Sequence, residues 1–221
     1  KTIYMNTGWA GPSPISVVEA IKGRLEYESY ESPTSKAVLD SGKAIRLEAR
    51  QAAAELLKVT PEEIALTQNT TEGLNLILNG LDWQKDDEII ACSLEHSSVL
   101  VPSYFLERRF GVKVKVVPLN PAENPSCIIN KVEAALSPRT RLVFASHIQY
   151  SSGLRMPVED IRDLTRNRGV LMLLDAAQAA GHIAIDLREI GCEFYSIPGQ
   201  KWLLGPSGTG ALYIRRDMIP H

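Results

Sequence analysis

The chain alternates between short apolar runs and longer segments whose apolar residues recur three or four positions apart. Short runs rich in β-branched residues predict strands, and apolar residues at helical spacing predict amphipathic helices. The predicted strands cover residues 63–68, 87–93, 112–119, 141–147, 170–175 and 210–216. The predicted helices between them cover residues 70–81, 96–110, 129–136 and 157–169.

Strands that alternate with crossover helices form a mostly parallel sheet with helices on both faces. The runs RLVFASH (141–147) and VLMLLD (170–175) are dominated by apolar residues, which is typical of central strands buried on both faces. We therefore predict an α/β fold, a three-layer sandwich around a mostly parallel sheet.

The first 60 residues follow a different pattern. A loop, YMNTGWAGPSP (4–14), precedes two helical stretches at 15–30 and 34–58, and no strand is predicted there. We expect residues 1–60 to pack against one large domain formed by residues 61–221.

The composition excludes some classes of partner. The 221 residues include 24 basic and 26 acidic side chains, for a net charge of −2, and 44% are hydrophobic. A soluble globular protein of this charge has no electrostatic reason to bind nucleic acid or an anionic membrane surface. No apolar run approaches the roughly 20 residues that span a bilayer. We expect neither nucleic acid nor a membrane as a partner.

The cysteines and histidines give no sign of a disulfide framework or a metal site. Cys92, Cys127 and Cys192 are far apart and form no CxxC motif, so a reducing, cytoplasmic compartment is expected. The four histidines lack the spacing of zinc ligands, so no metal is expected.

Ligands of open parallel sheets bind beyond the carboxyl ends of the strands, so we examined the residues that follow each predicted strand. Asn69, Thr70 and Thr71 open a helix directly after the strand at 63–68. The unpaired N–H groups and partial positive charge of a helix N-terminus suit a phosphate, to which two threonines add hydroxyl groups. N-capping by Asn69 or Thr70 is the alternative, and it requires no ligand.

His96 and Lys201 each allow more than one interpretation. His96 at the start of a helix could cap it, pair with Glu95, or lie flat on a planar ligand. Lys201 follows Gly199 and precedes Trp202, in a stretch with little other charge. It is either a surface residue or a partly desolvated amine that attacks a carbonyl group.

Asp175 ends the apolar strand at 170–175, and Gln178 follows three residues later. Capping by Asp175 is one explanation. A phosphate site, a planar group, a carboxylate and an amine at successive strand ends together match pyridoxal 5′-phosphate (PLP). Its aldehyde needs a lysine for a Schiff base, and its ring nitrogen needs a carboxylate, because a protonated ring is the better electron sink. We predict that Asp175 binds the ring nitrogen and that Gln178 binds the phenolic oxygen.

Several segments resemble, in order and spacing, the class V aminotransferase family of fold-type I PLP enzymes. The branch they resemble contains cysteine desulfurases, selenocysteine lyases and cystine lyases. The segments are YMNTGWAGPSP (4–14), NTTEGLN (69–75), EHSS (95–98), LLDAAQAAGHIAIDL (173–187) and GQKWLLGPSGTGALYI (199–214). The resemblance covers essentially the whole chain and implies a PLP-binding large domain over residues 61–221.

The resemblance also implies a role for each matching residue near the cofactor ring. Lys201 would carry the Schiff base and move the α-proton of the substrate, and His96 would stack on the ring. Asp175 would bind the pyridine nitrogen, and Gln178 would bind the phenolate oxygen. Residues 6–8 would lie near the substrate.

Thr70 and Thr71 would bind the phosphate, and here the chain departs from the family. The family usually has a serine or threonine, and then a histidine, where this chain has Pro198 and Gln200. Pro198 has no hydroxyl group, whereas the Gln200 amide can still donate to a phosphate.

The resemblance implies a homodimeric enzyme that acts on a small amino acid, with C–S bond cleavage expected. Aminotransferase or epimerase activity, or a shortened relative without activity, are the alternatives. Family members continue into a small C-terminal domain that carries the arginine for the substrate carboxylate and, in desulfurases, the sulfur-accepting cysteine. We expect that domain to be missing from this chain.

Overall fold

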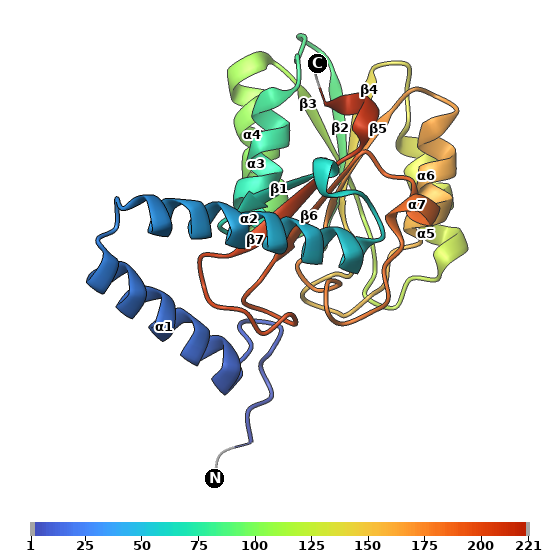
Figure 1. Cartoon of the computed structure of the whole chain (residues 1–221). Helices are drawn as coiled ribbons and strands as arrows, with labels where there is room; N and C mark the ends of the chain where they lie inside the picture. The colour runs from blue at the N-terminus through green and yellow to red at the C-terminus, as the bar shows by residue number, and fades with distance from the viewer. Residues whose placement is uncertain (1–2, 220–221) are drawn as a thin grey trace.

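A seven-stranded sheet lies at the centre of the molecule in the computed structural model, which describes residues 3–219 (Figure 1). The strands are β1 (Ile64–Thr67), β2 (Glu88–Cys92), β3 (Lys113–Val117), β4 (Thr140–Ser146), β5 (Leu171–Asp175), β6 (Phe194–Pro198) and β7 (Gly210–Ile214). Their order across the sheet is β1-β7-β6-β5-β4-β2-β3. β7 runs antiparallel to both its neighbours, and the other pairs are parallel, which confirms the predicted mostly parallel sheet.

Helices cover both faces of this sheet. They are α1 (Ile15–Glu31), α2 (Lys36–Leu57), α3 (Thr70–Gly80), α4 (Ser97–Phe110), α5 (Pro125–Ala135), α6 (Val158–Arg166) and α7 (Leu187–Ile190). Two 3-10 turns cover Pro61–Glu63 and Arg216–Met218. Figure 1 shows α3 and α4 on one side of the sheet and α5, α6 and α7 on the other. The three predicted layers are therefore confirmed.

Each central strand contributes side chains to two hydrophobic cores, because successive side chains point to opposite faces of the sheet. On β4, Leu142 and Phe144 pack with α3 and α4, whereas Val143 and Ala145 pack with α5 and α6. All four side chains are buried. This two-sided burial explains why the strand reads as a continuous apolar run in the sequence.

The hydrophobic pattern of the sequence does not predict two of the observed elements. One is β6, whose sequence FYSIP holds a serine and a proline, and the other is the four-residue helix α7. β6 is short, and its pairing with β5 and β7 rather than its own composition defines it as a strand. Among the described residues, no helix has both the length and the apolar character needed to cross a bilayer.

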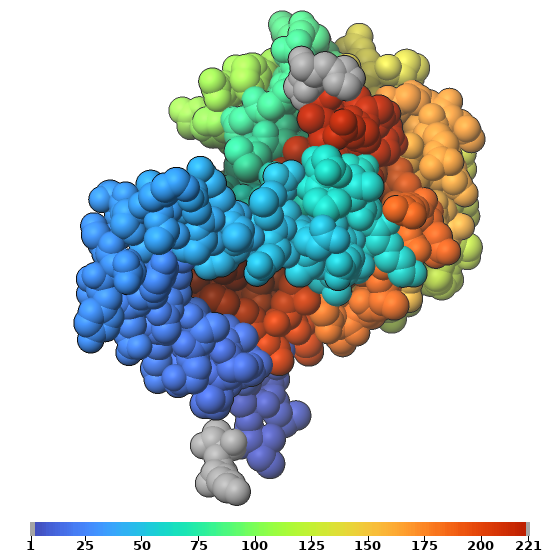
Figure 2. Space-filling model, viewed as in Figure 1, coloured from blue at the N-terminus to red at the C-terminus, as the bar shows by residue number. Residues whose placement is uncertain are grey.

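The two N-terminal helices differ in how they contact the sheet. α2 crosses beside β1 and contributes Ala54 and Leu57 to one core. α1 contacts α2 and has no buried residue. Figure 2 shows α1 at one side of the molecule, with α2 running from there across the front of the sheet domain. The division of the chain at residues 60 and 61 stays a prediction.

The strand register defines where a ligand site can form. β1, β2, β4, β5 and β6 all end at the same edge, and Ser146, Asp175 and Ser196 lie side by side across it. The residues that follow these strands are thereby brought together from distant parts of the sequence.

Candidate active site

A cavity of about 400 Å³ opens at the carboxyl edge of the sheet. Its volume lies within the range typical of small-molecule sites. The seven residues predicted to hold the cofactor all line it: Thr70, Thr71, His96, Asp175, Gln178, Gln200 and Lys201. Of residues 6–8, expected near the substrate, only Gly8 lines it. The remaining lining residues are Trp9, Asn69, Ser98, Ser146, Ile148, Tyr150, Ala177 and Pro198. The structure thus brings the whole predicted constellation into one place.

The N-terminus of α3 forms one wall of the cavity. Asn69 is the N-cap, since its Oδ1 accepts a hydrogen bond from the Glu72 N–H at 2.9 Å. The hydroxyl of Thr70 is buried, and no atom within residues 3–219 bonds to it. Thr71 Oγ1 lies 2.8 Å from Ser98 Oγ. Capping by Asn69 therefore leaves the Thr70 hydroxyl available to a ligand.

His96 caps α4 with its side chain. Its Nδ1 accepts from the Ser98 N–H at 3.1 Å, so the neutral ring carries its proton on Nε2. The ring meets Tyr150 edge-on, with centroids 4.9 Å apart. His96 therefore caps α4, as one alternative expected, and also lines the cavity.

Glu95 does not pair with His96, so that alternative is wrong. Its buried carboxylate instead accepts hydrogen bonds from the Ser146 N–H at 3.0 Å and from Gln149 Nε2 at 2.7 Å. Burial raises the pKa of Glu95 to about 7, although these hydrogen bonds act in the opposite direction. The side chain ties the loop after β2 to the end of β4.

Asp175 holds a buried carboxylate against the cavity. Its Oδ1 accepts from the Ala177 N–H at 2.9 Å. A turn and not a helix follows β5, so this oxygen satisfies a turn N–H and caps no helix. Burial raises the pKa of Asp175, while the Ala177 N–H and the charges of Lys201 and His96 lower it. Within the described chain no hydrogen bond reaches Oδ2, which leaves this oxygen to a proton donor in the cavity.

Lys201 is half-buried on the wall that Asp175 shares. Burial lowers the pKa of the Lys201 ammonium, and the nearby charge of Asp175 partly opposes this. A lower pKa makes the neutral, nucleophilic amine easier to reach. This environment favours the nucleophile over the alternative of an ordinary surface lysine.

Gln178 is fixed by hydrogen bonds to two residues that are distant from it in the sequence. Its Nε2 donates to the Gly8 carbonyl at 2.9 Å, and its Oε1 accepts from Trp202 Nε1 at 2.8 Å. Gly8 and Trp202 are separated from Gln178 by 170 and 24 positions respectively. No local sequence pattern could have joined them.

These groups fit PLP when each is compared with the part of the cofactor it would meet. The unpartnered Thr70 hydroxyl at the N-terminus of α3 is a donor that suits the phosphate, whereas Gln200 Oε1 is an acceptor and cannot bond to it. The uncommitted oxygen of Asp175 suits the protonated ring nitrogen, and Lys201 supplies the amine. Gln200 lies where the family usually has histidine, and its amide nitrogen keeps a donor there.

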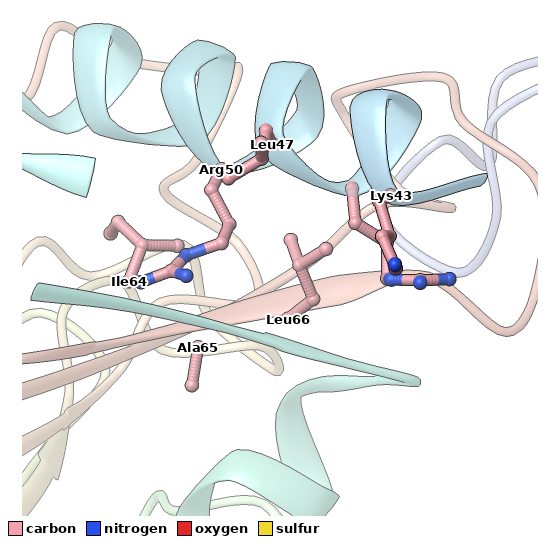
Figure 3. A pocket seen from close by; sticks show the side chains of 7 residues that line it. Lys43, Leu47, Arg50, Ile64, Ala65 and Leu66 are labelled. Carbon is pink, nitrogen blue, oxygen red and sulfur yellow. The ribbon is translucent and has the colours of Figure 1, made fainter. Parts of the chain in front are cut away.

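A second, larger cavity of about 600 Å³ lies between α2 and the edge strand β1 (Figure 3). Three basic and four apolar side chains line it: Lys43, Arg46, Leu47, Arg50, Ile64, Ala65 and Leu66. Arg50 already donates to the Pro61 carbonyl at 2.8 Å. The lining brings no carboxylate to oppose a ring nitrogen, so the chemistry belongs to the smaller cavity. Residues 3–219 also contain no cluster of side chains suited to a metal ion.

The fold and the site together define a fold-type I PLP-dependent enzyme domain. The model of the aminotransferase class-V family matches residues 7–221, and the chain belongs to this family. A solved relative with this fold, 31% identical to this chain, has glycine covalently linked to its PLP cofactor, which agrees with the fit of the site to PLP.

Similar proteins carry several activities. A probable cysteine desulfurase of Methanothermobacter thermautotrophicus is 34% identical over 98% of this chain and 54% of its own length. An isopenicillin N epimerase of Streptomyces clavuligerus is 32% identical over 96% of this chain and 53% of its own. A cystine C–S lyase solved with its product, cysteine persulfide, superimposes with a TM-score of 0.93, at 32% identity over 97% of this chain and 57% of its own. The chain spans about half the length of these relatives.

Proposed function

We propose that this chain is the PLP-binding part of an enzyme that cleaves the C–S bond of a small, cysteine-like amino acid. The convergence of Lys201, Asp175 and an unpartnered threonine hydroxyl in one cavity carries this proposal. A cysteine desulfurase and a cystine C–S lyase among the similar proteins support the choice of C–S chemistry.

Each residue has a defined task in this proposal. Lys201 holds the cofactor covalently, and its amine moves the proton of the substrate α-carbon. Asp175 Oδ2 holds the proton on the ring nitrogen, and His96 lies against the ring. Gln178 Nε2 donates to the phenolic oxygen. The bound cofactor supplies an electron sink that stabilises the carbanion left at the α-carbon.

The opposite wall would hold the phosphate. The Thr70 and Thr71 hydroxyls, the first N–H groups of α3 and the Gln200 amide are the donors proposed for it. Pro198 supplies no hydroxyl group at this wall. The departures from the usual family residues therefore leave several donors in place.

Epimerisation is a second candidate, because an isopenicillin N epimerase is 32% identical to this chain. Both reactions would begin with removal of the α-proton. Epimerisation would return a proton to the opposite face of the α-carbon, whereas C–S cleavage would break the bond between the β-carbon and sulfur. Incubating the PLP-loaded protein with cysteine, cystine and selenocysteine separates them. C–S cleavage by elimination predicts pyruvate and ammonia, with sulfide from cysteine or a persulfide from cystine. Cleavage that passes sulfur to an added thiol predicts alanine and the persulfide of that thiol, whereas epimerisation predicts the D-enantiomer and none of these products. The absence of every such product in a protein that holds PLP would contradict enzymatic activity for this chain.

We also propose that the protein is a homodimer. An exposed apolar patch on α3 and α4, formed by Leu76, Val101, Tyr104 and Phe105, supports this. The patch adjoins the cavity through Thr71 and Ser98, which line both the cavity and a shallow hollow on the patch. Sedimentation equilibrium tests the assembly: the Phe105→Glu variant is expected to sediment as a monomer, and a monomeric wild-type protein would contradict it.

A further inference from the structure

The amide of Gln178 is held at both ends by groups of opposite polarity. An indole N–H can only donate, so the atom 2.8 Å from Trp202 Nε1 has to be the amide oxygen. A backbone carbonyl can only accept, so the atom 2.9 Å from the Gly8 oxygen has to be the amide nitrogen. In a flipped amide, the Gln178 nitrogen would face the Trp202 N–H, which is also a donor. The Gln178 oxygen would face the Gly8 carbonyl, which is also an acceptor. The two contacts therefore select a single orientation.

Neighbouring residues hold Trp202 and Gly8 in the positions needed for these two hydrogen bonds to Gln178. The Trp202 indole stacks on the His182 ring, with centroids 4.1 Å apart and planes 16° from parallel. Gly181 has φ +82°, and a Cβ there would lie 2.8 Å from the Trp202 backbone. A Cβ at Gly8 would lie 3.2 Å from Gln178 Oε1. The first approach requires glycine and fixes the backbone of Trp202, and the second leaves little space between Gly8 and the Gln178 amide.

The orientation leaves one donor uncommitted. An amide nitrogen carries two hydrogens, and the Gly8 carbonyl accepts one of them. Gln178 also lines the cavity, so its nitrogen has a second hydrogen for a ligand there. The opposite orientation would instead present an oxygen to the same ligand and repel an anionic partner.

We propose that Trp202 and the Gly8 carbonyl are positioning groups that keep the Gln178 amide nitrogen directed toward the phenolic oxygen of the cofactor. The inference rests on the proposed function, and it assigns the loop around Gly8 a part in the cofactor site. Trp202 acts through Gln178 and needs no contact with the cofactor. A donor to the phenolic oxygen stabilises its deprotonated form, so a misoriented Gln178 raises the pH at which the bound cofactor titrates.

The contact itself is tested without cofactor. The chain has three tryptophans, so each indole N–H gives a resolvable resonance in a ¹H–¹⁵N spectrum. Gln178→Met is expected to shift the Trp202 indole resonance and to speed its hydrogen exchange, because the acceptor is lost. The Trp83 indole donates to the Leu78 carbonyl at 2.7 Å and is expected to remain unchanged. A Trp202 resonance unmoved by Gln178→Met overturns the inference.

The effect on the cofactor is tested by titrating the visible absorption of the PLP-loaded protein with pH. Trp202→Phe keeps an aromatic ring but removes the donor, and it is expected to raise the midpoint by about 0.5 to 1 pH unit. Trp83→Phe removes an indole donor of the same kind far from the cavity and serves as the matched control. Its midpoint is expected to equal that of the wild type.

A double-mutant cycle separates positioning from a general loss of structure. If Trp202 acts through Gln178, Trp202→Phe shifts the midpoint in the wild type and adds nothing in the Gln178→Met background. An equal shift in both backgrounds, or no shift in either, overturns the inference. A wild-type protein that binds no PLP contradicts the proposed function instead, while the spectrum without cofactor still decides whether the contact exists.

Discussion

Several residues of the site combine a local structural role with a group left for a ligand. Asn69 takes the N-cap of α3, which frees the neighbouring Thr70 hydroxyl. One oxygen of Asp175, which lines the cavity, bonds to the Ala177 N–H, while no hydrogen bond within residues 3–219 reaches the other. Capping and ligand binding were competing interpretations of the sequence, and the structure shows that they are compatible.

Thr70→Val is expected to weaken PLP binding without destabilising the chain. The hydroxyl has no partner in the described structure, so removing it leaves the free energy of unfolding without PLP equal or up to about 1 kcal/mol higher. Losing one hydrogen bond to a charged phosphate lowers the affinity for PLP about 10- to 100-fold. Fluorescence titration and thermal unfolding measure the two quantities.

Asn69→Ala is the matched control for Thr70→Val. Losing the N-cap of α3 is expected to cost about 1 kcal/mol of stability. The two adjacent variants should therefore separate stability from affinity. Unchanged PLP affinity in Thr70→Val would contradict the phosphate site at α3.

At the scale of the elements, Glu95 joins the start of α4 to the end of β4. Its carboxylate bonds to the Ser146 N–H and to Gln149 Nε2, in a loop that also carries Tyr150. The loops that follow β2 and β4 are thereby fixed to each other behind His96. This contact is buried, and it makes the arrangement of the two loops sensitive to protonation.

Glu95 is expected to destabilise the folded protein as pH rises. Its pKa is about 7 in the folded state and close to the ordinary 4.5 when unfolded, so the folded state binds the extra proton between these values. The contribution of Glu95 to the free energy of unfolding is therefore fully present below pH 4.5. It falls by about 3 kcal/mol as the pH rises to 7. Glu95→Gln mimics the protonated side chain and should abolish this loss.

The measurement is the difference in unfolding free energy between Glu95→Gln and the wild type at pH 5 and at pH 8. The difference matters because His147 acts in the opposite direction: burial lowers its pKa to about 4. The unfolded state then binds the extra proton between about 4 and 6.5, so His147 makes the protein more stable as pH rises. His147 contributes equally to Glu95→Gln and to the wild type, so its effect cancels when the two unfolding free energies are subtracted. If the subtracted value is the same at pH 5 and at pH 8, the role of Glu95 is contradicted.

The periodicity of the sequence predicts most elements because buried strands and amphipathic helices leave strong local patterns. It misses β6 and α7, since FYSIP and LREI are too short for a pattern and are defined by their neighbours. The site residues are predictable because strand ends of a parallel sheet meet at one edge. The Gln178 contacts with Gly8 and Trp202 are not, because they depend on how a distant loop packs.

At the scale of the whole molecule, the site and a buried ion pair lie at opposite edges of the sheet. Glu193 immediately precedes β6, and its carboxylate lies 2.9 Å from Arg162 Nη2. Both side chains are buried, and Arg215 pairs with the same carboxylate. Removing one member of a buried pair leaves an uncompensated charge.

Glu193→Ala is expected to destabilise the protein by about 3 to 5 kcal/mol. Asp217→Ala removes an exposed partner of Arg215 and should cost about 0 to 1 kcal/mol. PLP affinity of the folded fraction should remain at the wild-type value in both variants, because the cavity is at the other edge. Chemical denaturation with a PLP titration at low denaturant tests this, and a Glu193→Ala protein as stable as Asp217→Ala would contradict it.

The central claim is that Lys201 is the covalent attachment point for PLP. The most direct measurement is reduction of the PLP-treated protein with borohydride, followed by peptide mass spectrometry. The account predicts one cofactor adduct, on the peptide that contains Lys201. The adduct should be lost in Lys201→Ala and retained when an exposed lysine such as Lys36 is replaced by alanine. An adduct on another lysine, or none at Lys201, would contradict the account.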